Sequence, residues 1–350
     1  MVTAVLAGIG SAVPDGGAEQ DELWDGFFSR HFAGNRIARR LFESAGVRRR
    51  SVVANPLHED VSGWTTGARM HRYAQVAPEL GARAVAAALD DAAIPADEAG
   101  MFAVATCTGY ATPGVDIRIA AELGMRDDVQ RLLIGHMGCY AAVPALGGGA
   151  DFVIARGRTA VVLCLELTSL HLQPSTADTD QIVSHALFGD AAVAVVLRPA
   201  RPRTGELALA DVTARTDPGT TGHMTWDITD AGFRMGLSPA VPDVLGEHLV
   251  PVVDGLLARN GLSRRDVHGW AVHPGGPRIL DTAENALQLG PSALVRSREV
   301  LAQHGNCSSA TLPLIVERMV RCGEAGSGNL VALAFGPGLT LYAALLRAGS

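Results

Sequence analysis

The sequence predicts an α/β protein whose sheets are covered by helices on both faces. Short, strongly apolar segments alternate with helical segments along the whole chain, which is typical of strands buried between two helical layers. The strand–helix–strand order seen before residue 199 recurs after residue 204, and residues 199–204 have the composition of a linker. We therefore expect two similar halves, residues 1–200 and 201–350.

The spacing of apolar residues and the positions of glycines predict the helices and strands of the first half. A long helix is predicted over residues 72–93, because its apolar residues recur at helical spacing. Three glycines at 147–149 lie within the next long helix, where each costs about 1 kcal/mol relative to alanine. We expect that helix to be central, with another backbone packed closely against it. The other elements expected here are strands at 2–14, 101–107, 159–165 and 191–197, and helices at 21–45 and 115–123.

The second half repeats this alternation with different lengths. It is expected to begin with a strand over residues 207–214 and to end with two strands, at 329–335 and 339–346. Between them we expect helices at 241–260, 277–289 and 307–321, and a buried strand at 269–272.

Composition argues against several classes of function. The formal net charge of −7, without any basic stripe, argues against a nucleic-acid-binding surface. The N-terminus has no basic segment before its first strand, and no apolar run approaches the roughly 20 residues of a membrane span. The five cysteines are odd in number and scattered, which fits a reducing compartment. We therefore expect a cytoplasmic protein with no membrane partner.

Cys139 is the first candidate for a catalytic residue. It follows an apolar run and Gly138, and an alanine-rich segment comes after it, so we expect a strand, a tight turn and a helix. At a helix N-terminus, free backbone N–H groups and the helix dipole favour a thiolate, which is the nucleophilic form of cysteine. The alternative is a buried cysteine that only fills space. Partner residues elsewhere in the chain decide between the two.

His273 and Asn306 are the candidate partners of Cys139. His273 directly follows a predicted strand and precedes a Pro-Gly-Gly-Pro turn, and Asn306 lies beside Gly305 at a predicted helix start. Each has a structural alternative, as a histidine satisfied by its turn and as a helix N-cap. Cysteine, histidine and asparagine together, each at a glycine-flanked end of an element, indicate one active site.

Five short motifs occur along the chain in a fixed order. They are Gly138-Cys139, Leu187-Phe188-Gly189-Asp190, His273-Pro274-Gly275-Gly276-Pro277, Gly305-Asn306-Cys307-Ser308-Ser309 and Phe335-Gly336-Pro337-Gly338-Leu339. In order and spacing they resemble type III polyketide synthases, the chalcone and stilbene synthase family. The resemblance extends over nearly the whole chain. Ala334 departs from it, since it stands where the family has the first glycine of the last signature.

This resemblance implies a fold and a reaction. The fold is the thiolase fold, a five-layered αβαβα sandwich of two similar halves, working as a homodimer. The reaction is transfer of an acyl group from a CoA starter to Cys139, then decarboxylative Claisen condensation with malonyl-CoA or methylmalonyl-CoA, releasing a cyclised pyrone, resorcinol or related polyketide. His273 would form an ion pair that lowers the pKa of the thiol. His273 and Asn306 would donate hydrogen bonds that stabilise the enolate left after decarboxylation. CoA thioesters are the substrates, and no metal or redox cofactor is implied.

The resemblance also assigns two gate residues. Phe188 matches a gatekeeper phenylalanine between the CoA tunnel and the cavity, with core packing as its alternative. Met235 aligns with a second gatekeeper, usually phenylalanine, and Phe233 is the alternative for that place. A thioether is more flexible than a ring, so a Met235 gate would be less rigid.

Three further residues are expected at the cavity. Thr168 matches a pocket threonine of the plant enzymes. His171 falls where those enzymes have a small threonine, so its imidazole would shrink or redirect the pocket, or bind a starter. Thr112 stands where the plant enzymes donate a methionine across the dimer interface.

Arg48, Arg49 and Arg50 form the densest basic cluster of the chain. They are either a solvated face or the group that binds the CoA phosphates. Ser308 is either a hydroxyl that starts a helix or a group near Cys139 that orients a water or the growing chain.

Two other classes of protein are the alternatives. One is an enzyme like ketoacyl-ACP synthase III, or an acyltransferase, that uses acyl-carrier protein and condenses once. The other is a non-catalytic thiolase-fold partner subunit, against which the complete set of Cys139, His273 and Asn306 argues.

Overall fold

Nine strands form one mixed sheet with two halves that meet at its middle. The computed structural model describes residues 2–349, and the strand order is β11-β12-β13-β8-β1-β7-β6-β4-β5. Strands β1 and β8 pair over three residues only, from Ala4–Leu209 to Leu6–Leu207, so the halves are joined by a short seam. The strands of the first half are β1 (Thr3–Ala12), β4 (Ala99–Thr106), β5 (Gln130–Gly135), β6 (Thr159–Leu167) and β7 (Asp190–Ala200). Those of the second half are β8 (Leu207–Thr216), β11 (Val267–Val272), β12 (Asn329–Gly336) and β13 (Thr340–Ala348).

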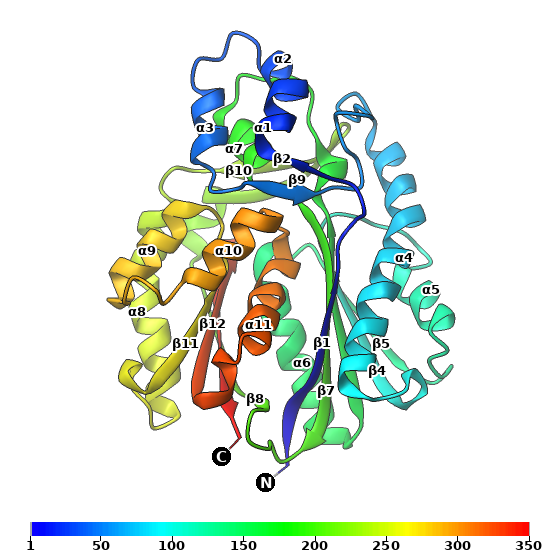
Figure 1. Ribbon diagram of the computed structural model, residues 1–350, viewed down its shortest axis with the longest axis vertical. Helices are drawn as coiled ribbons and strands as arrows, with labels where there is room; N and C mark the ends of the chain where they lie inside the picture. The colour runs from blue at the N-terminus through cyan, green and yellow to red at the C-terminus, as the bar shows by residue number, and fades with distance from the viewer. Residues whose placement is uncertain (1, 350) are drawn as a thin grey trace.

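Helices cover and separate the two halves of the sheet, giving five layers (Figure 1). The outer layer on the first half contains α4 (Thr66–Ala92) and α5 (Val115–Glu122), and that on the second half contains α8 (Val241–Arg259) and α9 (Pro277–Leu287). Helices α6 (Ala142–Arg156) and α11 (Thr311–Arg321) lie between the halves. Three separate hydrophobic clusters fill the spaces between the layers. The predicted α/β class and thiolase fold are confirmed.

The alternation of side chains along a strand explains how each half of the sheet supplies two of these clusters. In β6, Val161 and Leu163 pack in the outer cluster of the first half, whereas Val162 and Cys164 pack in the central one. Successive side chains of a strand point to opposite faces, and every residue of β6 is buried. A continuous apolar run is therefore the expected sequence signal of such a strand.

The central position predicted for the glycine-rich helix is confirmed, although the reason differs. A Cβ on Gly149 of α6 would lie 3.1 Å from the side chains of Leu197 and Val162, and one on Gly148 would meet nothing within 4 Å. The close neighbours are therefore sheet side chains rather than another backbone. The helical stretch Gly138–Arg156 is long and apolar enough to cross a membrane by length and composition alone, and it is 56% buried inside this fold.

Several elements above the sandwich were not predicted from the sequence. The expected helix over residues 21–45 is broken into short pieces, and the hairpin of β9 (Met224–Thr229) and β10 (Gly232–Leu237) lies where no strand was expected. With α7 (Thr179–Leu187), these elements form a cap at the top of Figure 1. The pieces between residues 17 and 51 are β2 (Gly17–Glu19), α1 (Gln20–Leu23), a π-helical turn (Trp24–Phe28), α2 (Ser29–His31), α3 (Ala38–Ser44) and β3 (Arg49–Ser51).

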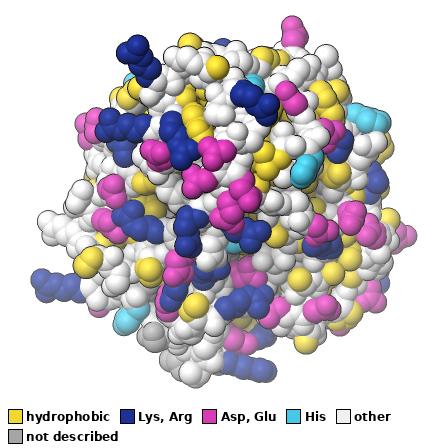
Figure 2. All heavy atoms as spheres, turned by 45° about the horizontal axis from the view of Figure 1, so that its top comes forward, with side chains coloured by type: hydrophobic (Ala, Val, Ile, Leu, Met, Phe, Trp, Pro, Cys, Tyr) yellow, Lys and Arg dark blue, Asp and Glu magenta, His cyan; other side chains and the backbone are white. Residues whose placement is uncertain are grey.

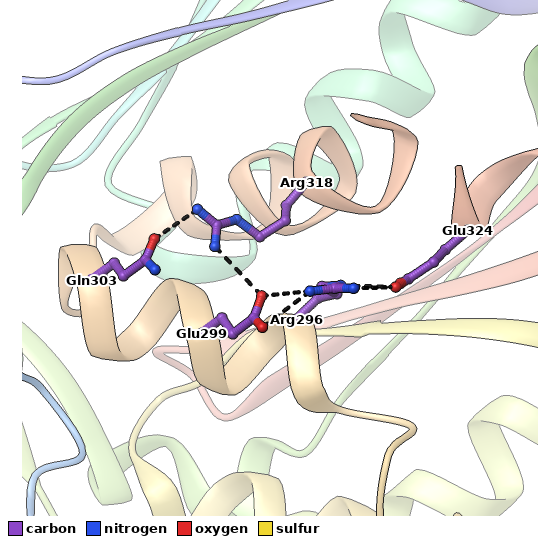
Figure 3. A network of polar contacts seen from close by, with 5 residues as sticks. All are labelled: Arg296, Glu299, Gln303, Arg318 and Glu324. Carbon is purple, nitrogen blue, oxygen red and sulfur yellow. Dashed lines mark hydrogen bonds and ion pairs between the residues drawn. The ribbon is translucent and has the colours of Figure 1, made fainter. Parts of the chain in front are cut away.

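A network of charged side chains ties the unpredicted helix α10 (Val295–His304) to its neighbours (Figure 3). Arg296 bonds to Glu299 and to Glu324, and Arg318 of α11 bonds to Glu299 and Gln303. Helix α10 ends directly before Gly305 and Asn306, so the network fixes the helix that leads into the Asn306 loop.

Candidate active site

Cys139 lies in a tight turn that the sequence makes possible. The residue occupies a 3-10 turn, Gly138–Tyr140, that leads directly into α6. Gly138 has φ +76°, and a Cβ there would lie 2.6 Å from Cδ of Pro337. Glycine is therefore required both by the backbone conformation and by the close approach of the loop after β12. The side chain of Cys139 is buried at 6% exposure.

His273 reaches the site from the end of β11. Its backbone N–H donates to the carbonyl of Leu333 at 2.8 Å, which extends the pairing of β11 with β12 by one residue. The ring is fully buried with its edge toward Phe335, at a centroid distance of 5.7 Å. Neither ring nitrogen has a hydrogen-bond partner among residues 2–349. A buried imidazole with both nitrogens free is costly unless a substrate completes it.

Asn306 is held in one orientation by its own loop. Its backbone N–H donates to the carbonyl of Leu187 at 2.8 Å, and its side-chain Oδ1 accepts the N–H of Ser308 at 2.8 Å. Because Oδ1 is occupied, Nδ2 is left as the group that can donate to a ligand. Gly305 precedes it at φ +72°, where a Cβ would lie 2.6 Å from the carbonyl of Leu187.

One cavity of about 410 Å³ brings these three side chains together. Cys139, His273 and Asn306 all line it, and its remaining wall is mainly apolar. We call it the tunnel. A second space of about 10 Å³, the inner pocket, lies beside Cys139. The inner pocket is lined by Cys107, Thr108, Gly138, Cys139, Thr168, Phe188, Trp226, Met235, Ser308 and Pro337.

The electrostatics of the site favour a neutral thiol and a neutral imidazole in this structure. Burial raises the pKa of Cys139 to about 12, although hydrogen bonding to the side chains of Ser308 and Asn306 opposes that shift. Burial also lowers the pKa of His273 to about 3. Desolvation disfavours the charged form of each group, so neither exchanges a proton with water readily near neutral pH.

A buried carboxylate network behind Cys139 was missed from the sequence. Glu166 accepts hydrogen bonds from the N–H of Cys107, the hydroxyl of Thr108 and the hydroxyl of Ser309, at 3.0, 2.7 and 2.5 Å. Burial raises the pKa of Glu166, against these hydrogen bonds. The Cys107 thiol lies 3.3 Å from the hydroxyl of Ser308. A single acidic residue in the otherwise apolar segment 160–167 was the available signal.

Phe188, the predicted gatekeeper, is shared by several cavities. It lines the tunnel, the inner pocket and a third cavity of about 50 Å³. Met235 lines the tunnel and the inner pocket, whereas Phe233 lines none of the three cavities and stacks on His171 at 4.4 Å. Of the two residues considered for the second gate, Met235 is therefore the one at the cavity.

His171 is fully engaged by the protein. Its Nε2 lies 2.7 Å from the carbonyl of Thr108, and its Nδ1 accepts the N–H of Phe233 at 2.9 Å. Burial lowers its pKa to about 3, so the ring is neutral. Both ring nitrogens are therefore occupied by protein groups in the structure described, and the role of His171 at the cavity stays a prediction. Thr168 also lines the inner pocket, with its hydroxyl donating to the carbonyl of Gly189 at 2.8 Å.

Trp226 is the largest pocket residue that the sequence did not reveal. Its indole N–H donates to the carbonyl of Cys107 at 2.8 Å, and its ring lies 6.3 Å from that of Phe188. It belongs to β9, which was not expected as a strand. Thr112, by contrast, lies on an exposed loop and lines none of the three cavities of this single chain.

The three adjacent arginines do not act as one cluster. Arg48 and Arg49 are exposed, and Arg49 lies 3.9 Å from Glu19. Arg50 is 4% exposed and donates to the carbonyls of His185 and Phe188, so it is buried while its two neighbours are exposed, and CoA binding by these arginines stays a prediction. On the face shown in Figure 2, basic and acidic side chains are interspersed rather than gathered into one basic patch. Arg278, which lines the tunnel, was not singled out from the sequence.

Comparison with protein families matches the chain in two parts. Residues 2–200 match the family described as "Chalcone and stilbene synthases, N-terminal domain", and residues 209–349 match "Chalcone and stilbene synthases, C-terminal domain".

Individual proteins show the same similarity. The chain is 35% identical over 320 residues to 1,3,6,8-tetrahydroxynaphthalene synthase of Streptomyces peucetius subsp. caesius, covering 90% of this chain and 84% of that protein. It is 31% identical over 314 residues to the alpha-pyrone synthesis polyketide synthase-like Pks18 of Mycobacterium tuberculosis, covering 86% and 80%. The crystal structure of 1,3,6,8-tetrahydroxynaphthalene synthase from Streptomyces coelicolor A3(2), described as a bacterial type III polyketide synthase, superposes with a TM-score of 0.92 at 26% identity and 99% coverage of both chains.

Proposed function

Because this chain belongs to the chalcone and stilbene synthase family and is a type III polyketide synthase, we propose that Cys139, His273 and Asn306 carry its chemistry. The enzyme is a CoA-dependent acyltransferase that extends a starter with malonyl-CoA by decarboxylative condensation. The observation that carries the residue assignment is the shared cavity: a thiol, an unpartnered imidazole and an oriented amide line one tunnel.

Loading of the starter uses the Cys139 thiol and the free imidazole. His273 takes the proton of Cys139, and the thiolate attacks the carbonyl carbon of the acyl-CoA, so that the CoA thiolate leaves and takes up a proton. The proton moves within a buried pair, which therefore keeps its net charge. The helix N-terminus and the side chains of Ser308 and Asn306 stabilise the thiolate that results.

Condensation uses His273 and Asn306 as hydrogen-bond donors. The thioester carbonyl of malonyl-CoA accepts from both, carbon dioxide leaves, and the negative charge moves onto that oxygen as an enolate. The enolate carbon then attacks the acyl-Cys139 carbonyl, and Cys139 leaves as a thiolate. The lengthened chain is now a β-ketoacyl-CoA thioester, so the Cys139 thiolate attacks its thioester carbonyl, takes the chain back and releases CoA before the next malonyl-CoA condenses. Two relatives are named for a hydroxylated naphthalene and an alpha-pyrone, and we propose a cyclised pyrone, resorcinol or related product here.

We propose that the enzyme is a homodimer joined at the edge of the first half. Among residues 2–349, β5 is the last strand of the sheet and pairs with β4 alone. An ion pair of 2.6 Å between Arg131 and Asp116 shows that α5 lies beside this strand. Four large apolar side chains of this region are at least 42% exposed in the single chain. Exposed apolar side chains that lie together usually mark a surface that a partner covers. They are Tyr110, Ile117, Leu132 and Leu133.

Three further assignments complete the proposal. CoA thioesters act here as substrates, and we propose that the reaction needs no metal or redox cofactor, because the chemistry above uses only side chains and backbone dipoles. We propose a cytoplasmic location, since all five cysteines are free thiols in the structure described. The division into halves at residues 200 and 201 stays a prediction.

The proposed function is tested by incubation of the purified enzyme with malonyl-CoA and a panel of acyl-CoAs, without any carrier protein. Mass spectrometry should show products with two or more extensions from the wild type and none from Cys139→Ala. Cys164→Ala is the matched control, because that thiol is buried in the central layer and lines none of the three cavities. A single condensation, or a need for carrier protein, would instead support an enzyme like ketoacyl-ACP synthase III, and full activity of Cys139→Ala would refute the nucleophile.

A further inference from the structure

A third cavity is lined by Phe188 and Trp226, and six of its fourteen lining residues are polar or charged. We call it the rear chamber. It has a volume of about 50 Å³ and shares Phe188, Trp226 and Thr168 with the inner pocket beside Cys139. The rear chamber is therefore separated from the site of acyl transfer by the thickness of one side chain. The polar residues of its wall are Arg50, Thr168, Ser169, His171, Ser184 and His185.

Arg50 contributes to this chamber a guanidinium group whose hydrogen bonds are only partly satisfied. Its Nη1 donates to the carbonyls of His185 and Phe188, at 2.5 and 2.8 Å. Its Nε and Nη2 are buried and have no hydrogen-bond partner among residues 2–349. Burial lowers the pKa of Arg50 to about 10, which still leaves the guanidinium charged at neutral pH. Unmade hydrogen bonds of a buried charged group are costly, so this arrangement favours an incoming acceptor.

The nearest carboxylate is not free to neutralise Arg50. Asp190 interacts with it through charge, but the carboxylate already accepts three hydrogen bonds, from the N–H of Val53 and from the N–H and hydroxyl of Ser169. The hydroxyl of Thr168, which donates to the carbonyl of Gly189, lies 3.1 Å from the same carboxylate. Asp190 is thus engaged by neighbouring segments of the chain.

The remaining spare polar groups of the chamber are donors as well. Nε2 of His185 accepts the N–H of Gln173 at 3.1 Å, and burial lowers the pKa of His185 to about 3. A neutral imidazole whose Nε2 accepts carries its proton on Nδ1. The chamber therefore offers Arg50 and His185 N–H groups, together with the hydroxyl of Ser184.

We infer that the rear chamber binds a carboxylate at the far end of the acyl group carried by Cys139. This inference rests on the proposed function, and it names a class of starter: CoA thioesters of dicarboxylic acids longer than malonic acid, in which one carboxyl group is free. A carboxylate supplies the acceptors and the negative charge that the chamber lacks. The acyl chain passes between the rings of Phe188 and Trp226, whose centroids lie 6.3 Å apart, when these side chains turn aside.

The test compares charged starters with neutral starters of the same shape. Succinyl-, glutaryl- and adipoyl-CoA are each paired with the CoA ester in which an isopropyl group replaces the carboxylate. The measured quantity is the ratio of kcat/KM within each pair, with malonyl-CoA as extender. The wild type should prefer at least one charged starter by about tenfold or more. Arg50→Met should lower that ratio by about tenfold to a hundredfold, as expected for lost hydrogen bonds to a charged group. Arg83→Met, a surface arginine paired with Asp15, should keep the wild-type ratio.

Each outcome has a defined meaning. A wild-type ratio near one for every pair, or a ratio unchanged in Arg50→Met, would overturn the inference. Arg50 also bonds to two carbonyls, so if Arg50→Met does not fold, Ser184→Ala provides the test: it should lower the ratio severalfold, and an unchanged ratio counts against the chamber. If no starter of either kind is loaded on Cys139 of the wild type, the proposed function itself has failed, whereas loading and extension of neutral starters alone rejects only the chamber.

Discussion

At the scale of single residues, the fixed orientation of the Asn306 side chain leads to a prediction for the rate of malonyl-CoA decarboxylation. Its Oδ1 is occupied by the N–H of Ser308, so the loss of the side chain removes an oriented donor. Asn306→Ala should slow malonyl-CoA decarboxylation by about 10²–10³-fold, the usual cost of one oxyanion donor. The measurement is carbon dioxide release from malonyl-CoA. Asn329→Ala, which removes an exposed amide bonded to the carbonyl of Asp266, should leave the rate unchanged, and a near-normal rate in Asn306→Ala would contradict the assigned role.

The pair of Cys139 and His273 predicts an unusual pH profile. Burial raises the pKa of Cys139 to about 12 and lowers that of His273 to about 3, so the pair neither gains nor loses a proton between pH 6 and 9. Transfer within the pair is then independent of pH, and alkylation of Cys139 by iodoacetamide should be nearly flat over this range. In His273→Gln the thiol can only release its proton to solvent, and the rate should rise about tenfold per pH unit.

The control for that profile is His248→Gln, which alters a histidine paired with Asp217 at 3.0 Å outside the active site. It should alkylate with the flat wild-type profile. A wild-type rate that climbs as steeply as that of His273→Gln would show that the imidazole does not accept the proton. Slow, flat alkylation that His273→Gln leaves unchanged would favour a non-catalytic subunit.

At the scale of elements, two glycines of the same helical stretch should respond in opposite ways. Gly138→Ala places a Cβ at φ +76° and 2.6 Å from Pro337, so the turn that presents Cys139 must move. We expect loss of most activity and a lower free energy of unfolding. Gly148→Ala adds a Cβ with nothing within 4 Å in an exposed helical position and should raise the free energy of unfolding by about 0.5–1 kcal/mol. Urea denaturation measures both, and wild-type activity of Gly138→Ala would contradict the role of the turn.

The elements predicted from the sequence were those with local signals. Strands buried on both faces, such as β6 and β7, are continuous apolar runs, and α4 has a clear apolar stripe. The hairpin of β9 and β10 was missed because its burial is irregular, with exposed and half-buried residues mixed. Helix α10 was missed because it is polar and depends on the charged network of Figure 3.

Site residues could be predicted where the residue type itself indicates the chemistry. They could not be predicted where a role depends on which face of a strand the side chain occupies. Glycine-flanked Cys139, His273 and Asn306 were all identified, and the structure places them in one cavity. Arg49 and Arg50 look alike in sequence, yet they alternate along β3, so one is exposed and the other buried. Trp226 and Glu166 reach the site only through tertiary packing.

At the scale of the whole molecule, the exposed edge of the sheet predicts how two copies associate. Leu133 is 45% exposed on β5, and a buried charge there would have no partner. Leu133→Glu should convert a dimer into a monomer, measured by light scattering after gel filtration. Val320→Glu, at a side chain of 40% exposure on α11, should stay dimeric. A monomeric wild type would contradict the proposal, as would a dimer that survives Leu133→Glu.

The proposed reaction depends on one covalent intermediate, the acyl-enzyme. The cysteine that carries its acyl group can be identified by peptide mass spectrometry. Tryptic digestion after brief incubation with hexanoyl-CoA separates Cys139, on the peptide of residues 132–156, from Cys107, on the peptide of residues 84–118. Mass spectrometry should find the hexanoyl group on the peptide of residues 132–156 in the wild type and find no acylated peptide in Cys139→Ala. Acylation of the peptide that carries Cys107, or an acyl-enzyme that survives Cys139→Ala, would contradict the assignment of the nucleophile.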